Sequence, residues 1–265
     1  MTLSISVVTA SLNQANFIEE TIASVLGQNY PKLEYVIVDG KSTDGTAEIA
    51  AEYRSSLHHF VSEPDTGHAN ALNKNFARTS GEIMAWLNSD DKYLPWTFAT
   101  VSEIFEQHPD VNWIVGINSW WNDKGAMIAT ANVYNNIFDY LTEKPFGIQQ
   151  ESCFWRRSLW NKADGYLDES YRFLIDVELS CRFFLLDALW HAGSVLSGYR
   201  IHGQNRATQF EAACIAERKR ATVELRAKLD PGALQRMPKD YFAISYDVRN
   251  SAWAKHSVPR QPRKP

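Results

Sequence analysis

The chain has 265 residues, of which 45% are hydrophobic, so we expect a globular protein with a substantial buried core. The formal net charge of -4 argues against the electrostatic footprint of a nucleic-acid-binding protein. No apolar run reaches the roughly 18 residues of a membrane span, and the amino terminus lacks a signal-peptide pattern. The three cysteines are far apart without metal-type spacing, which favours a reduced, cytoplasmic protein.

The first hundred residues alternate strand and helix patterns with short connections. The hydrophobic periodicity predicts strands at 5–10, 33–38, 59–61 and 83–87, and helices at 18–26, 46–54, 68–78 and 95–107. Such an order predicts an α/β fold with a largely parallel sheet and helices on both faces. Ligands of these sheets bind at the carboxyl ends of the strands.

The second half of the chain is less regular. Strands are predicted at 111–121, 127–133 and 190–202. The segment 176–186 is apolar nearly all round, which indicates a helix buried in the core, and 210–229 is predicted as a long charged helix. The sequence beyond Pro231 is expected to be loop-like.

The end of the chain is basic. It reads either as a solvated end or as a peripheral contact with an anionic membrane surface. The residues concerned are Lys255, Arg260, Arg263 and Lys264.

Adjacent carboxylates follow the predicted buried strand 83–87 directly, in Asn88-Ser89-Asp90-Asp91. Such a pair repels itself unless a cation compensates it, and oxygen-rich sites suit Mg²⁺ or Mn²⁺ holding phosphates. The alternative is a helix cap or turn before Tyr93-Leu94-Pro95. Asp39 also ends a predicted strand, and Glu63 and Asp65 follow a third, so the topology brings carboxylates to one sheet edge. This convergence weakens the alternative.

The usual nucleotide-binding loops are missing. Neither G-x-G-x-x-G nor G-x-x-x-x-G-K-[ST] is present, so nucleotide binding would need a different motif. Asp39, followed by Gly40 and the turn 42–45, offers a carboxylate that can accept from a base or a ribose. For Thr43 and Asp44, a cap and turn ahead of the next helix is the favoured interpretation.

Four blocks resemble family 2 glycosyltransferases in content, order and spacing. They are Ile5-Ser6-Val7-Val8-Thr9 with Asn13, then 36–40 with 42–46, then 62–67, and Trp86-Leu87 with 88–91. The resemblance covers about residues 3 to 205 and implies a glycosyltransferase A-type fold. It implies a nucleotide-sugar-binding half at 1–110 and an acceptor half at 111–205, with a C-terminal helix and tail at 206–265.

The resemblance also implies the donor and metal residues. The donor site would comprise Thr9, Ser11, Asp39, Asp65, Gly67, Asn73 and Asp90. Thr9 would lie against the nucleotide, Asp39 would accept from uracil or another base, and Asp90 would face the ribose or the metal. Asp91, Asp90 and His202 would hold Mn²⁺ or Mg²⁺ bridging the diphosphate of a nucleotide-sugar, in the first instance a UDP-sugar.

His202 lies in the late block 199–204, which resembles a family segment that approaches the metal or the diphosphate. Arg200 in the same block would contact a phosphate. The alternative for His202 is an ordinary packing or surface histidine.

The block at 165–170 followed by 173–179 is similar to the family's carboxyl-terminal block, in which an acid opens the buried helix. That acid is Asp176, which would take the proton of the acceptor hydroxyl and so imply inversion at the anomeric carbon. A plain helix cap is the alternative. Gln150 and Glu151 would hydrogen-bond sugar hydroxyls of the acceptor, and Trp155 would be a stacking platform or an ordinary core aromatic.

The resemblance thus implies an inverting, metal-dependent glycosyltransferase acting on a saccharide or lipid-linked acceptor, with bacterial surface polysaccharide synthesis as its natural setting. His68 and Asn70 stand where close relatives have glutamine and aspartate, which leaves the donor sugar open. A nucleotidyltransferase would need a Gly-rich, basic loop after the first strand, and 11–16 lacks one. A non-catalytic glycan- or nucleotide-sugar-binding module is the other alternative, against which Asp91 and Asp176 speak.

Overall fold

A computed structural model describes residues 2–142 and 147–260. The strands are β1 (Ile5–Ser11), β2 (Leu33–Asp39), β3 (His59–Ser62), β4 (Ile83–Trp86), β5 (Lys92–Tyr93), β6 (Trp113–Val115), β7 (Asn118–Asn122), β8 (Met127–Ala131), β9 (Cys153–Arg156), β10 (Trp190–Ala192), β11 (Ser197–Ile201), β12 (Tyr241–Asp247) and β13 (Ala252–Val258).

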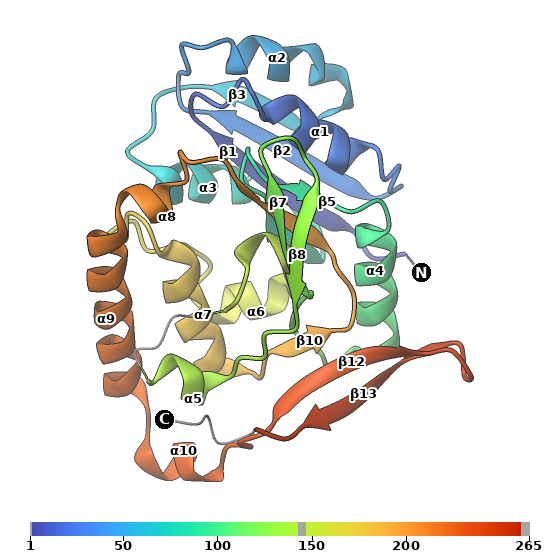
Figure 1. Ribbon diagram of the computed structural model, residues 1–265, viewed down its shortest axis with the longest axis vertical. Coiled ribbons are helices and arrows are strands. Elements are labelled where there is room, and N and C mark those ends of the chain that lie inside the picture. Colours follow the sequence, from blue (N-terminus) through green and yellow to red (C-terminus); the bar gives the residue numbers. More distant parts are fainter. Residues whose placement is uncertain (1, 143–146, 261–265) are drawn as a thin grey trace.

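Helices occupy much of the remaining chain (Figure 1). They are α1 (Ile18–Leu26), α2 (Thr46–Glu52), α3 (His68–Phe76), α4 (Thr97–Gln107), α5 (Ile137–Tyr140), α6 (Arg157–Lys162), α7 (Ile175–Leu186), α8 (Arg206–Gln209), α9 (Glu211–Lys228) and α10 (Pro231–Arg236), with short 3₁₀ turns η1 (Arg54–Ser56) and η2 (Gln150–Ser152). All predicted elements of the first hundred residues are present, most with bounds shifted by one or two residues.

The main sheet has nine strands in the order β13-β12-β10-β6-β9-β4-β1-β2-β3. β1 pairs in parallel with both β2 and β4, and β2 with β3, as the alternating strand and helix patterns predict. β9 is antiparallel to both of its neighbours, and β12 and β13 form an antiparallel pair. The strands β1 to β4 are therefore parallel to one another, and the antiparallel pairs lie on the other side of the sheet.

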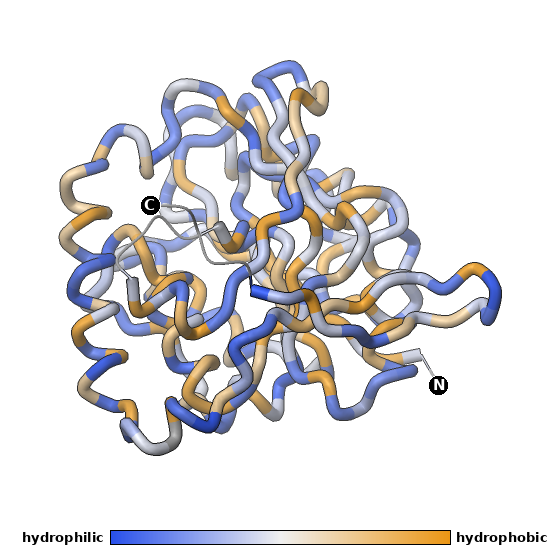
Figure 2. The backbone as a smooth tube through the Cα atoms, turned by 60° about the horizontal axis from the view of Figure 1, so that its bottom comes forward, coloured by the Kyte–Doolittle hydropathy of each residue, from blue (hydrophilic) through white to orange (hydrophobic). Residues whose placement is uncertain are grey.

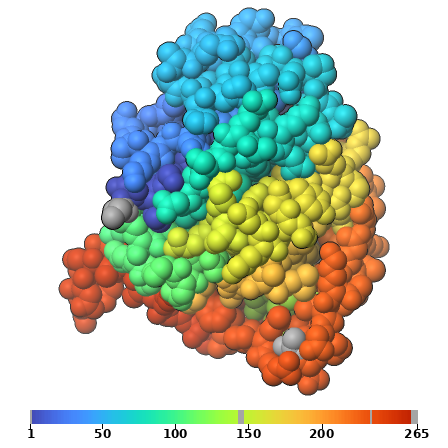
Figure 3. Space-filling model, turned by 180° about the vertical axis from the view of Figure 1, so that it is seen from behind, coloured from blue at the N-terminus to red at the C-terminus, as the bar shows by residue number. Residues whose placement is uncertain are grey.

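Both faces of this sheet are buried, which explains why its central strands read as continuous apolar runs. Along β4, Met84 and Trp86 point into one core and Ile83 and Ala85 into the other. The first core is covered by α3, α6, α7 and α9, and the second by α1, α2 and α4. Seen from behind, the blue amino-terminal part and the yellow to red later segments form one continuous surface (Figure 3).

A second, four-stranded sheet has the order β5-β11-β7-β8. It explains two wrong predictions, because 111–121 and 190–202 are each divided between the two sheets rather than forming single strands. The break in 111–121 falls at Gly116, where an added Cβ would lie 2.8 Å from Leu196. Beyond Gly116 the later parts of the two divided segments lie side by side. Ile117 N–H donates to Ser194 O at 2.8 Å.

The prediction of a loop beyond Pro231 is also wrong. Residues 241–258 form the β12–β13 hairpin, which extends the main sheet past β10, and the turn of the hairpin reaches out from the body of the molecule (Figure 2). The strand alternation is short and mixed with polar residues, so the hydrophobic pattern alone did not reveal it. α10 precedes the hairpin.

Two of the basic residues near the end of the chain are paired internally. Lys255 Nζ lies 2.5 Å from Asp110 Oδ2, and Arg260 Nη2 lies 2.9 Å from Asp139 Oδ1. Arg263 and Lys264 lie outside the described residues. In the part of the chain that the structure describes, no helix is long and apolar enough to cross a membrane.

Candidate functional site

The turn that carries Asp90 and Asp91 lies at the carboxyl end of β4, between α1 and the second sheet. Thr21 on α1 holds it from one side, since its hydroxyl donates to Ser89 O at 3.0 Å and Asp91 O at 2.7 Å. Asn88 Nδ2 donates to Asp91 Oδ2 at 3.1 Å. These bonds fix the turn, and they give Asn88 a structural role.

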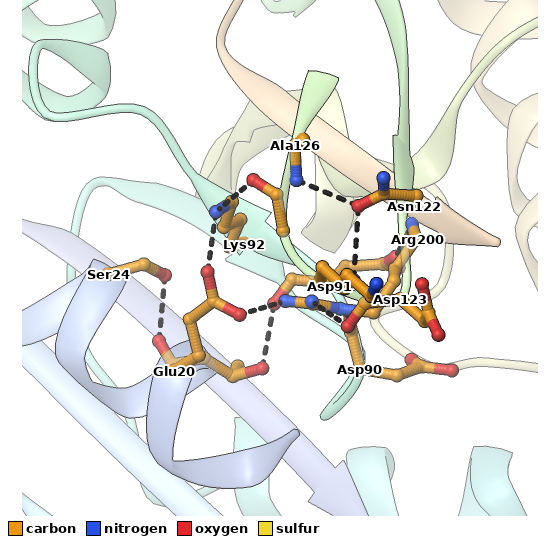
Figure 4. Close-up of polar contacts among 12 residues, drawn as sticks. Glu20, Ser24, Asp90, Asp91, Lys92, Asn122, Asp123, Ala126 and Arg200 are labelled. Atoms are coloured by element: carbon orange, nitrogen blue, oxygen red, sulfur yellow. Dashed lines mark hydrogen bonds and ion pairs between the residues drawn. The ribbon is translucent and has the colours of Figure 1, made fainter. Parts of the chain in front are cut away.

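Arg200 on β11 holds the same turn from the other side (Figure 4). Its guanidinium donates to Asp90 O at 2.7 Å and to Asp123 O at 3.3 Å, and forms an ion pair with Glu20 at 2.5 Å. The Arg200 side chain is only 2% exposed. The geometry therefore does not support the expected phosphate contact for Arg200, because its guanidinium is buried and bonds groups of the protein through all three nitrogens.

Lys92 joins this network next to Arg200. Its ammonium lies 2.5 Å from Glu20 Oε1, donates to Gly125 O at 3.1 Å and stands 4.3 Å from the centre of the Trp121 ring. Glu20 consequently accepts from both cations, which hold the pKa of its carboxyl below the usual value against the opposing effect of burial. The network joins α1, the carboxylate turn and the β7–β8 hairpin.

Asp91 is buried, and both of its oxygens have internal partners. Oδ1 accepts the backbone N–H of Arg200 at 2.9 Å, while Oδ2 accepts from Asn88. Burial, followed by the charges of Asp90 and Glu151, raises the pKa of Asp91 well above its ordinary value. A carboxyl that is buried and doubly bonded is poorly placed to ligate a metal, so the geometry favours Asp90 over Asp91 for that role.

Asp90 and His202 are brought together by β4 and β11. His202 Nε2 lies 2.9 Å from Asp90 Oδ2, and the His202 ring packs 4.6 Å from the ring of Phe17. The Asp90 side chain is 20% exposed, whereas that of His202 is 3% exposed. The other ring nitrogen of His202, Nδ1, is buried without a hydrogen-bond partner.

Asp90 Oδ2 and His202 Nε2 face each other, and a divalent cation could take the place of their hydrogen bond, with its remaining ligands coming from a diphosphate and water. The described residues contain no group of three or more His, Cys, Asp or Glu side chains able to hold a metal by themselves. Any cation at Asp90 and His202 would therefore need the substrate to complete its shell, as Mg²⁺ commonly does with phosphates.

The predicted donor residues Asp39 and Thr9 are buried at the adjacent strand ends. Asp39 Oδ2 accepts from Ser62 Oγ at 2.6 Å and from Ser42 N–H at 3.1 Å, which orients its carboxylate. The hydroxyl of Thr9 bonds Tyr35 Oη at 3.1 Å and points into the protein. Ser11 lies two residues after Thr9 on β1, and its hydroxyl oxygen is buried without a hydrogen-bond partner. All three side-chain polar groups are buried in this structure, those of Thr9 and Asp39 completely.

Asp65 and Gly67 shape the loop between β3 and α3. The carboxylate of Asp65 accepts from Gly67 N–H at 2.8 Å and lies close against Gly40, where an added Cβ would be 2.7 Å from Oδ2. Gly67 has φ +141°, a backbone conformation that side chains other than glycine rarely adopt. Glu63, by contrast, faces Lys74 at 3.5 Å.

Asn73 and Asn70 on α3 contact Leu167 and Glu169 in the second half of the chain. Asn73 donates to Leu167 O at 2.9 Å and accepts from Leu167 N–H at 2.7 Å. Asn70 donates to Glu169 at 3.2 Å, and Asn73 does so at 3.1 Å. An aspartate at position 70 would face Glu169 with like charge, so Asn70 suits this particular neighbour.

Asp176 lies at the start of α7, beside the predicted acceptor residues. Together with Gln150 and Trp155 it lines a cavity of about 20 Å³. Burial raises the pKa of Asp176 to about 6, although the backbone N–H groups at the start of the helix oppose this effect. An acid with a pKa near 6 is mostly ionised at neutral pH and can still bind a proton, as a general base requires.

The predicted acceptor residues differ in their surroundings. Gln150 Nε2 donates to Trp86 O at 2.8 Å, and its Oε1 is buried without a partner. Glu151 is 2% exposed with an unpartnered Oε1, and burial raises the pKa of its carboxyl. Trp155 is also 2% exposed and packs against Trp86 and Phe76, so the core-aromatic alternative fits and the stacking platform does not.

Comparisons with known proteins agree with this geometry. The family model described as Glycosyl transferase family 2 matches residues 6–161. The chain is 42% identical over 92 residues to the protein named "Putative teichuronic acid biosynthesis glycosyltransferase TuaG" of Bacillus subtilis (strain 168), a match covering 34% of this chain and 36% of that protein. The match thus spans about a third of the length of that relative.

Solved structures match over more of the chain. S. aureus TarS 1-349 in complex with UDP-GlcNAc has a TM-score of 0.66 at 18% identity, covering 87% of this chain and 69% of that one. The mannosyltransferase PcManGT from Pyrobaculum calidifontis, in complex with GDP-Man and Mn²⁺, has a TM-score of 0.61 at 20% identity, covering 90% of this chain and 66% of that one. At such identities the likeness establishes the fold.

The mixed sheet, its flanking helices and the carboxylate turn at the end of β4 thus define a glycosyltransferase A-type fold. The family model covers more than half of the chain. The chain accordingly belongs to glycosyl transferase family 2.

Some residues of this site have no recognisable signal in the sequence. Glu20 is one, because a single acid in an amphipathic helix looks like an ordinary exposed residue. Its partners Lys92 and Arg200 come from 72 and 180 positions away, and only the folded structure reveals such pairs.

Proposed function

We propose that this protein transfers a sugar of the hexosyl type from a nucleotide-sugar, in the first instance a UDP-sugar, to a hydroxyl of a saccharide or lipid-linked acceptor. The observation that carries the proposal is the Asp90–His202 pair at the carboxyl end of β4, at the sheet edge that also holds Asp39. Residues 1–110 would bind the donor and 111–205 the acceptor. The names of the relatives, one in teichuronic acid biosynthesis and one bound to UDP-GlcNAc, support a role in bacterial surface polysaccharide synthesis.

In the proposed reaction the acceptor oxygen attacks the anomeric carbon while Asp176 accepts the hydroxyl proton. The bond between the sugar and the diphosphate breaks, and its electron pair leaves with the nucleoside diphosphate. One base and one direct displacement imply inversion of the anomeric configuration. Asp39 would orient the nucleobase, and Gln150 and Glu151 would hold acceptor hydroxyls.

Asp90 and His202 would hold the divalent cation, which supplies charge neutralisation for the departing diphosphate. Since imidazole is a poorer ligand for Mg²⁺ than for transition metals, this pair favours Mn²⁺. The Mn²⁺ in the complex of PcManGT is in keeping with that preference. Arg200 would act through the turn, by holding Asp90 in place.

The test is to incubate the protein with Mn²⁺ and a panel of UDP- and GDP-sugars and to measure nucleoside diphosphate release. We expect release with at least one donor, its loss in Asp176→Asn, and unchanged binding of the nucleoside diphosphate in that variant. Asp164→Asn is the matched control, because Asp164 is an exposed acid near the same loop. Binding of donors without release, with a range of oligosaccharide and lipid-linked acceptors, would instead favour the binding-module alternative.

A further inference from the structure

The long charged helix α9 lies beside α7, at the outer edge of the molecule (Figure 1). Its buried residues Cys214, Ala221 and Leu225 anchor it to the core. Between these anchors, Glu217, Arg220 and Glu224 recur at intervals of three and four residues, which places them along one side of the helix. All three contact the segment 168–174, which leads directly into Asp176.

Glu217 makes the largest set of these contacts. Its carboxylate accepts three consecutive backbone N–H groups, those of Arg172 at 2.7 Å, Phe173 at 3.0 Å and Leu174 at 2.8 Å. Hydrogen bonds from backbone N–H groups to an ionised carboxylate are about twice as strong as those between neutral groups. The last of the three donors is the residue that caps α7, two positions before Asp176.

Arg220 and Glu224 hold the preceding part of the segment. Arg220 donates to Ser170 Oγ at 2.8 Å and stacks over the ring of Tyr171 at 4.1 Å. The hydroxyl of Tyr171 donates to Glu224 at 2.9 Å. Each residue from 170 to 174 therefore has a partner on α9.

We propose that Glu217 is a positioning residue for Asp176, so that α9, although it lies beyond residue 205, belongs to the catalytic machinery. The proposal rests on the proposed role of Asp176 as the base. Without the three N–H bonds the segment 172–174 would lose its fixed path, and the start of α7 would carry Asp176 away from the acceptor hydroxyl. A displacement of about 1 Å at a reacting group can lower the rate on the order of a hundredfold.

Glu217 also contributes to the electrostatic surroundings of Asp176. The ionisable groups that act on or respond to Asp176 come from four elements: Glu217, Arg218 and Cys214 on α9, Glu151 in η2, Cys153 on β9 and Tyr140 on α5. Among them Glu217 raises the pKa of Asp176, whereas Arg218 lowers it. Removing the Glu217 charge should therefore lower the pH at which Asp176 gains its proton.

The test compares Glu217→Gln with Glu217→Asp and with Glu211→Gln, a control at an exposed acid on the same helix. For Glu217→Gln we expect kcat to fall about ten- to a hundredfold with the donor KM nearly unchanged. The acidic limb of its pH–rate profile should move to lower pH. Glu217→Asp keeps the charge on a shorter side chain, so we expect a smaller fall in kcat and an unmoved limb. Glu211→Gln should leave both unchanged.

Two results would overturn the proposal. One is an unchanged kcat in Glu217→Gln. The other is a parallel loss of kcat, donor affinity and thermal stability with the acidic limb in place, which would indicate a structural role only. Turnover that survives in Asp176→Asn would contradict the role of Asp176 as the base, and the absence of turnover in the unmodified protein would contradict the proposed function. Both failures are therefore distinguishable from a failure of the role of Glu217.

Discussion

His202 and Asp90 lie 112 positions apart in the sequence, yet His202 Nε2 lies 2.9 Å from Asp90 Oδ2 at the exposed end of the carboxylate turn. Asp91, the immediate neighbour of Asp90, is instead buried and bonded on both oxygens. Asp90 and Asp91 are adjacent acids of the same type in different environments. Substitutions at the two positions should therefore have different effects.

Asp90→Asn and His202→Gln should each weaken Mn²⁺ binding in the presence of UDP by about ten- to a hundredfold, because each removes one of the two proposed protein ligands. Asp91→Asn should keep most of the Mn²⁺ affinity, since its carboxyl is turned inward. Titration calorimetry with Mn²⁺ and UDP measures these affinities, and Asp123→Asn serves as the exposed-acid control. Equal losses in Asp90→Asn and Asp91→Asn would contradict the assignment.

The reaction should lose rate as the pH falls through about 6, because burial raises the pKa of Asp176 to about 6 and only the ionised carboxylate can accept the proton. At pH 7 about nine-tenths of Asp176 is ionised, so a further rise in pH should gain little. The check is a profile of kcat against pH at saturating donor, metal and acceptor. A flat profile down to about pH 5 would contradict this role for Asp176.

The folded state should lose stability on acidification through His191 on β10. Its Nδ1–H donates to Phe242 O at 3.0 Å and its Nε2 accepts from Asn135 N–H at 2.9 Å, while burial lowers its pKa from 6.5 to about 4. Because the unfolded chain binds this proton more readily, the contribution is complete above pH 6.5 and is lost as the pH falls toward 4. The full loss is on the order of 3 kcal/mol.

Urea unfolding at about pH 7.5 and pH 5 measures this contribution. His191→Gln should lose less stability between the two pH values than the unmodified protein does. His58→Gln, at an exposed histidine, should lose as much as the unmodified protein. Identical losses in all three proteins would show that His191 carries no such linkage.

Arg200→Ala should destabilise the fold by about 3 kcal/mol, because the buried guanidinium bonds Asp90 O, Asp123 O and Glu20. Glu20→Gln should cost only about 1 kcal/mol, since its side chain is 44% exposed and solvent screens its charge. The midpoints of urea unfolding give both values. A Glu20→Gln loss as large as that of Arg200→Ala would place the main contribution in the ion pair rather than in the backbone contacts.

The sequence predicted the half of the fold in which neighbours along the chain are neighbours in space. Strands β1 to β4 and their helices follow each other in parallel units, so periodicity and strand-end chemistry located Asp39 and Asp90 together. The second half could not be divided in the same way, because β6 continues into β7 and β10 into β11 across two sheets. Only a close contact such as that between Gly116 and Leu196 reveals where the chain changes sheet.

The candidate site, too, could be predicted from the sequence only in part. The expected groups Asp90 and His202 meet, but the burial of Thr9, Asp91 and Trp155 depends on the direction of each side chain, which a motif does not specify. Likewise, Glu217 belongs to a helix that reads as an ordinary solvated one. Its role depends on three N–H groups that lie 43 to 45 positions earlier in the chain.

The β12–β13 hairpin has a consequence for how the chain is made. Until residues 241–247 leave the ribosome, β10 has no neighbour on that side, and its open backbone groups could pair with another nascent chain. The main sheet is thus closed last, by a segment far from the proposed chemistry. Synthesis that stalls before residue 241 would leave a folded first half of the chain attached to an unprotected sheet edge, a state that chaperones would have to shield from aggregation.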